Sequence, residues 1–213
     1  MRFSEILVLM IISGVVLSNP LVDFFSEIAG MRDYHIVVEM VFHVRDPETW
    51  EFLTPDPSIT FEVAVRNMED FYFKIREPEI FSGVEFAYSS STGRLYSGFE
   101  GNYTMDVYNM PKSFVVDLVR GMMDSLREPL FSVNYKENDG EYVFSFEYTP
   151  MMLFIIKRLR IEPIKMKIVL SGNSAEPKEL IFIGGEDEWV KMKFLKFEYG
   201  KPVDEFFKIV QGS

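Results

Sequence analysis

The chain has 213 residues, a length that suits one domain, or at most two small ones, with a large apolar core. Its net charge of −11 argues against nucleic acid as a partner, because a polyanion repels phosphates, and gives no help in binding an anionic membrane. The absence of cysteine rules out disulfides, thiol nucleophiles and iron–sulfur clusters.

Residues 1–18 have the features of a secretory signal peptide. Arg2 precedes an apolar run from Ile6 to Leu17, and the small residue Ser18 follows it. Twelve helical residues at about 1.5 Å each span roughly 18 Å, too short for a bilayer core of about 30 Å. We expect cleavage of this segment, which leaves residues 19–213 as a single domain. An uncleaved anchor is the alternative, because Glu5 is unusual so near the start of a signal.

Two elements are expected next. Residues 19–30 are typical of a short amphipathic helix that begins at Asn19 and Pro20 and ends at Gly30. Strict alternation of side-chain type over residues 34–44 predicts a long strand, and the prolines after it predict a loop.

Shorter alternating segments follow, and each predicts a strand in an antiparallel meander. They are Ile59–Val65, Phe71–Glu77, Val84–Ser89, Arg94–Phe99 and Asn102–Tyr108. The Asn102 sequon for glycosylation is a common chance match.

The meander is interrupted at residues 110–129. Phe114, Leu118 and Met122 recur at helical spacing there, so we expect a helix, which Gly121 weakens. A hairpin of strands 130–136 and 141–149 is expected next, around the turn at Asn138, Asp139 and Gly140.

The apolar block from Met151 to Ile156 has two interpretations, a buried strand or a short helix. Pro150 before it and the cations Lys157, Arg158 and Arg160 after it favour the helix. Three strands, at 164–170, 179–183 and 190–199, close the fold, followed by an extended or short helical tail with Phe206, Phe207 and Ile209.

These elements predict an α+β fold that is mainly β. About eleven antiparallel strands make a sheet large enough to curl, and the helices are too few to be crossovers between parallel strands. We therefore expect two or three helices to cover the concave face of one curved sheet as a lid.

Signals for catalysis or metal binding are weak. His35 and His43 lie on one face of a predicted strand, and eight residues at about 3.3 Å each put them roughly 26 Å apart. The two histidines therefore cannot share a metal, and each is expected to be solvated. The acidic stretch 186–188 has calcium binding and a solvated turn as alternatives. We expect no enzyme activity, no metal and no cofactor.

The 21 Phe and 13 Met residues have two explanations, a packed core or a cavity for a ligand. A core that only packs prefers side chains with fixed rotamers, whereas Met adapts to ligands of more than one shape. Composition leaves both open.

Three segments resemble the periplasmic outer-membrane lipoprotein carrier family, the LolA-like proteins. They are FEVAVRNMEDFYFKIREP at 61–78, EYVFSFEYTP at 141–150 and PKELIFIGGEDEWVKMKFLKFEYGKPVDEFFKI at 177–209. The family usually has Pro after the arginine of the first segment, where this chain has Asn67 after Arg66. The stretch VEFAYSSSTGRLYSG at 84–98 is similar to the related envelope-stress sensors, the RseB-like proteins.

The resemblance implies a half-open barrel with a helical lid, whose hollow takes the acyl chains of a lipoprotein or another lipid. Donor or acceptor partners would be membrane-bound proteins, and the carrier would be extracytoplasmic and monomeric. A sensor that binds a membrane protein through the hollow or the sheet edge is one rival, and a structural domain with a solid core is another. The expected lipid-binding residues come from the strands and from the lid, and they are Phe61, Val63, Phe73, Phe86, Phe144 and Phe146, with Phe114, Leu118, Met122, Met151 and Phe154 in the lid.

Overall fold

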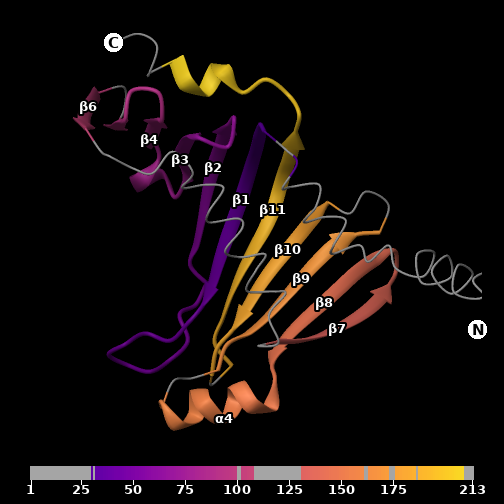
Figure 1. Ribbon diagram of the computed structural model, residues 1–213. Coiled ribbons are helices and arrows are strands. Elements are labelled where there is room, and N and C mark those ends of the chain that lie inside the picture. The colour runs from indigo at the N-terminus through magenta and orange to yellow at the C-terminus, as the bar shows by residue number, and fades with distance from the viewer. Residues whose placement is uncertain are drawn as a thin grey trace, which may run out of the picture.

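A single antiparallel sheet forms the body of the protein (Figure 1). The structure, a computed structural model, describes residue 30 and residues 32–99, 102–107, 131–160, 163–172, 176–185 and 187–208. Its eleven strands follow the order β6-β5-β4-β3-β2-β1-β11-β10-β9-β8-β7. The first and last strands pair with each other in the middle, and the sheet stays open between β6 and β7.

The strands are β1 (Tyr34–His43), β2 (Ser58–Arg66), β3 (Asp70–Glu77), β4 (Val84–Ser89), β5 (Arg94–Phe99), β6 (Asn102–Val107), β7 (Phe131–Asn138), β8 (Glu141–Tyr148), β9 (Lys165–Ser171), β10 (Pro177–Ile183) and β11 (Trp189–Tyr199). The described helical elements are α4 (Pro150–Arg158) and two short 3₁₀ turns, η1 (Glu79–Phe81) and η2 (Asp204–Phe207). The mainly β antiparallel fold and each of the eleven predicted strands are confirmed, with bounds that differ by at most two residues.

Local chemistry explains two of these elements. Asp139 and Gly140 adopt positive φ angles of 48° and 75°, as a tight two-residue turn requires, and the predicted hairpin of β7 and β8 is confirmed. The block after Pro150 is a helix, with Pro150 at its start and Lys157 and Arg158 in its last turn.

Two clusters of buried side chains stand out among the described residues. One is built from β8 and β9, where Phe144, Phe146, Ile168 and Leu170 are buried. The other joins the β2–β5 part of the sheet to the C-terminal segment through Ala64, Tyr72, Ala87, Tyr96, Val203 and Phe207. The two clusters lie on opposite faces of the sheet, as its registers show.

The expected lid is not confirmed. Helix α4 lies beyond the ends of β8 and β9 and not over the middle of the sheet (Figure 1). The helices expected at 19–30 and 110–129 lie outside the described residues, apart from Gly30. None of the described helices is long and apolar enough to span a bilayer.

Candidate functional site: the inner face of the sheet

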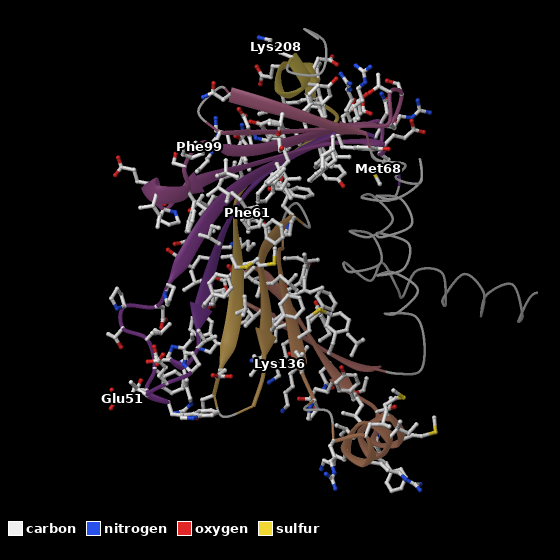
Figure 2. All side chains as sticks on the ribbon, turned by 90° about the vertical axis from the view of Figure 1, so that its left-hand side faces the viewer. Glu51, Phe61, Met68, Phe99, Lys136 and Lys208 are labelled. Atoms are coloured by element: carbon white, nitrogen blue, oxygen red, sulfur yellow. The ribbon has the colours of Figure 1, made fainter. Side chains whose placement is uncertain are left out.

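One face of the sheet is apolar over most of its width. Antiparallel registers put Val38 beside Phe61, Val63 beside Phe73 and Phe73 beside Phe86, all pointing to the same side. Among the paired residues of β1–β4 and β8–β11, this face carries no charged side chain. We call it the inner face, because Figure 2 shows Phe61 on the side toward which the sheet curls.

Three phenylalanines form a row on the inner face across β2, β3 and β4. The ring centroids of Phe61 and Phe73 lie 5.4 Å apart, and those of Phe73 and Phe86 lie 6.2 Å apart. These three residues and Val63 are only half-buried. The row therefore still exposes apolar area, and covering that area with hydrocarbon releases free energy in proportion to the area covered.

The inner face is packed more tightly on β8 and β9. Phe144 is 1% exposed and Phe146 is fully buried, and both belong to the core cluster of these strands. The sequence predicts both as ligand contacts, and in the structure they are core residues on the same face as the phenylalanine row. A ligand on the inner face would thus contact side chains that are already close-packed over β8 and β9.

The remaining predicted contacts belong to the expected lid. Met151 and Phe154 of α4 are 65% and 67% exposed, so their role in a lid is not confirmed. Phe114, Leu118 and Met122 lie outside the described residues.

Desolvation affects an ionisable group at one end of the inner face. Tyr34 begins β1 and lies between Val65 and Tyr199 on the neighbouring strands. Burial raises the pKa of Tyr34 to about 12. Its phenol is therefore neutral at physiological pH, in keeping with the uncharged character of the face.

The opposite, outer face carries the charges. Lys193 donates to Glu39 at 2.9 Å, and Arg76 donates to Glu62 at 2.7 Å. Hydrogen bonds from Lys196 and Lys201 lower the pKa of Glu198 to about 2, so this carboxylate is ionised at neutral pH. These charged groups lie on the outer face, and Glu62 among them is buried, at 5% exposed.

His35 contradicts one expectation of the sequence analysis. It is 8% exposed, and its Nε2 lies 2.6 Å from Glu62 Oε1. The ring also lies 4.6 Å from that of Phe206, which the C-terminal segment brings onto the outer face. His35 is therefore a buried, hydrogen-bonded residue and not a solvated one, and sequence alternation alone does not reveal the segment that covers it.

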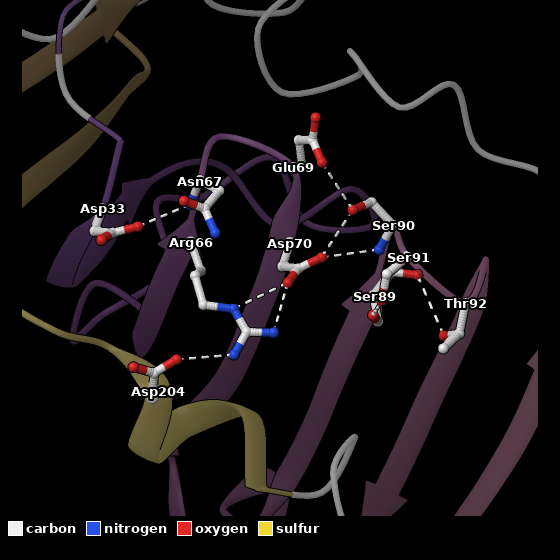
Figure 3. Close-up of polar contacts among 10 residues, drawn as sticks. All are labelled: Asp33, Arg66, Asn67, Glu69, Asp70, Ser89, Ser90, Ser91, Thr92 and Asp204. Atoms are coloured by element: carbon white, nitrogen blue, oxygen red, sulfur yellow. Dashed lines mark hydrogen bonds and ion pairs between the residues drawn. The ribbon is translucent and has the colours of Figure 1, made fainter.

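An ion-pair network fixes the C-terminal segment to the outer face (Figure 3). Arg66 at the end of β2 donates to Asp70 at 2.6 Å and to Asp204 of η2 at 3.0 Å. The guanidinium also lies 4.3 Å from the centroid of the Phe207 ring, whose side chain is fully buried. Asp70 accepts two further hydrogen bonds from Ser90. The network holds η2 on the face opposite to the phenylalanine row.

Metal binding has no support in the part of the chain that the structure describes. No group of three or more His, Asp or Glu side chains converges there. In the acidic stretch 186–188, Glu186 lies outside the described residues, and Glu188 accepts a hydrogen bond from the backbone N–H of Arg45 at 3.1 Å. Gly184 donates to the carbonyl of Glu188, as in a hairpin connection.

Sequence reasoning missed several inner-face residues of β1 and of β9–β11. The sequence shows that side-chain types alternate in these strands, but it does not show which strands pair with one another. The half-buried members of this set include Ile36, Met166, Leu180, Met192, Phe194 and Phe197.

Comparison with known proteins gives no match to a family model and none to a curated protein. The solved structures that are similar to this chain include the following three. Lipoprotein LppX of Mycobacterium tuberculosis is 12% identical, with 87% of this chain and 98% of that chain covered and a TM-score of 0.46. A LolA superfamily protein of Nitrosomonas europaea is 8% identical, with coverage of 87% and 96% and a TM-score of 0.37. The MucA/MucB complex of Pseudomonas aeruginosa is 7% identical, with coverage of 87% and 58% and a TM-score of 0.47. One of the three is described as a LolA superfamily protein, the group that segments of the sequence resemble.

Proposed function

We propose that the protein is an extracytoplasmic carrier that binds the acyl chains of a lipoprotein or another lipid on its inner face. The observation that carries the proposal is the half-buried row of Phe61, Phe73 and Phe86 on a face without charged residues over β1–β4 and β8–β11. The sequence resemblance to lipoprotein carriers supports the same interpretation.

The physical chemistry of the face fits such a ligand. Each buried methylene contributes about 0.8 kcal/mol, so a chain of about sixteen carbons gains on the order of 10 kcal/mol. Phe61, Val63, Phe73 and Phe86 are the proposed contacts. Phe144 and Phe146 form the floor beside them. The charged side chains of these strands lie on the outer face, part of which the C-terminal segment covers.

The lid remains part of the proposal. In it, Met151 and Phe154 close over the ligand, together with residues of the expected helix at 110–129, which are Phe114, Leu118 and Met122. Release then requires an acceptor with a higher affinity for the acyl chains, because transfer from the carrier is favourable only to a site that binds them more tightly. This cycle needs no catalytic group and no cofactor, and a monomer of residues 19–213 could perform it outside the cytoplasm.

A sensor that binds a membrane protein is the second candidate, and the edge strand β7 favours it. Its described side chains, residues 132–138, are all exposed, and β7 pairs with β8 alone among the described strands. An extended peptide can add to such an edge through main-chain hydrogen bonds.

Native mass spectrometry of the protein isolated from its own cell envelope separates the two candidates. The carrier predicts lipid or lipoprotein bound to the monomer, and the bound species should fall sharply in a Phe73→Glu variant. The sensor predicts one co-purifying membrane protein, whose binding Phe73→Glu leaves intact. Protein free of both would count against both candidates.

A further inference from the structure

Helix α4 carries apolar side chains on the side that faces solvent. Met151, Phe154 and Ile155 are 65%, 67% and 41% exposed, and helical spacing puts them on one side. Ile156 is buried on the opposite side of the helix, and Leu159 just beyond the helix end is 63% exposed. A helix that is apolar on both sides is normally enclosed, so the exposed side is a surface that something else can cover.

Cations lie at the end of this apolar surface. Lys157, Arg158 and Arg160 are exposed, and none of them forms an ion pair with a described residue. Residues 151–165 contain four basic side chains and one acidic side chain, although the whole chain has a net charge of −11. Local charge therefore has the opposite sign to the protein as a whole.

The helix is also placed where it can reach a flat surface. Both views show α4 at one extremity of the molecule, beyond the strand ends and far from the C-terminal turn η2 (Figures 1 and 2). Exposed apolar residues next to cations at such a tip have the chemistry of helices that lie in the interface of a lipid bilayer.

We propose that α4 docks the protein on a membrane surface that contains anionic lipids. Met151 and Phe154 enter the headgroup region, while Lys157, Arg158 and Arg160 contact lipid phosphates. Acidic side chains that lie more than about 10 Å from the membrane oppose this little, because charges at that distance are screened at physiological salt.

A second copy of the chain is a poorer occupant of the same surface. A symmetric contact through α4 would bring the cations of both copies to one interface, where the helix sequence PMMLFIIKR supplies no acidic partner for them. An anionic bilayer supplies the complementary charge. The docking surface goes beyond the proposed carrier function and does not depend on what the inner face binds. It is an alternative to the proposed lid role of Met151 and Phe154, because these side chains cannot cover a ligand and enter a bilayer at the same time.

A probe at Met151 tests the proposal directly. Because the chain has no cysteine, Met151→Cys in the full-length protein gives a single site for an environment-sensitive fluorophore. With vesicles of phosphatidylcholine and phosphatidylglycerol, we expect a blue shift and at least about threefold less quenching by acrylamide. Vesicles of phosphatidylcholine alone should leave both unchanged. Trp50→Cys is the matched control, since Trp50 is 66% exposed in a loop that also contains Glu48 and Glu51.

A charge variant makes the test specific to the lipid phosphates. Neutralising Lys157, Arg158 and Arg160 to Gln in the same labelled protein should weaken binding of the probe site to anionic vesicles about a hundredfold. Lys136→Gln on β7 should leave it unchanged. Three results would overturn the proposal: a probe that anionic vesicles do not protect, protection that survives the triple variant, or protection that grows with protein concentration in the absence of vesicles. The last would identify a second copy as the occupant.

Discussion

The substitution Phe73→Glu tests the central step of the proposed function. Phe73 lies in the middle of the phenylalanine row, 5.4 Å from the Phe61 ring and 6.2 Å from the Phe86 ring. A glutamate there places a charge on a face that has none over β1–β4 and β8–β11. Because the carboxylate keeps its water, the acyl chain loses apolar contact around it.

The expected loss of affinity follows from the geometry. If the hydrated carboxylate displaces about four methylenes from the row, binding weakens by about 3 kcal/mol, which is about a hundredfold in Kd. Displacement of a fluorescent sixteen-carbon fatty acid measures the change. Ser145→Glu is the matched control, because Ser145 lies on the outer face of β8 opposite Lys167, where a new carboxylate meets water and a cation.

The comparison depends on folded variants. Phe73 is only half-buried, so the substitution should leave a cooperative thermal transition, which circular dichroism detects. Phe73→Ser, which removes the ring without adding charge, should give a smaller loss, about tenfold. If folded Phe73→Glu binds the fatty acid within threefold of the parent protein, the row does not contact the ligand and the reasoning is wrong.

Three further predictions concern stability. Phe207→Ala should lower the free energy of unfolding by about 3–5 kcal/mol in urea titrations, because this side chain is fully buried against the outer face. The control Phe81→Ala, at a 50% exposed site, should change the free energy of unfolding by less than about 1 kcal/mol. Equal effects of the two substitutions would contradict the packing of the C-terminal segment. The pKa of Tyr34 is raised to about 12, so as pH rises above 10 its phenol ionises in the unfolded protein before it ionises in the folded protein. Between pH 10 and pH 12 the free energy of unfolding should therefore fall by about 2 kcal/mol more than it does in a Tyr34→Phe variant. Parallel pH profiles of the two proteins would refute this. Gly172→Ala should lower the free energy of unfolding by about 1–3 kcal/mol in the same titrations, because a Cβ at this position would clash with the carbonyl oxygen of Gly140. An unchanged urea midpoint would show that the two backbone segments do not approach so closely.

Local alternation of side chains was enough to predict the strands of this fold. The period-two pattern in segments such as 34–43 and 71–77 sets which residues share a face, and the six strand residues proposed for lipid binding do share one. Alternation works here because one face is apolar and a slip of one residue would turn that face to water.

Long-range pairing could not be predicted in the same way. The first and last strands meet in the middle of the sheet, and the register between them shifts at a bulge opposite Val37 and Val38. As a result both Phe194 and Phe197, which are three residues apart, lie on the inner face. No local pattern indicates such a bulge.

The burial of individual side chains also could not be predicted from the sequence. Phe61 and Phe146 have the same residue type and the same place in an alternating strand, but Phe61 is half-buried and Phe146 is fully buried. His35 was expected in water and is covered by Phe206, which follows it by more than 170 positions. In each case the outcome depends on segments that are distant in sequence, and those contacts are not encoded in a single strand.

Crystals grown with a brominated sixteen-carbon fatty acid would show most directly whether hydrocarbon enters the fold. We expect anomalous bromine density on the inner face, within van der Waals contact of the Phe61, Phe73 and Phe86 rings. Density found only on the outer face, or an inner face whose phenylalanine row is closed by the protein's own side chains while the ligand stays unbound, would contradict it.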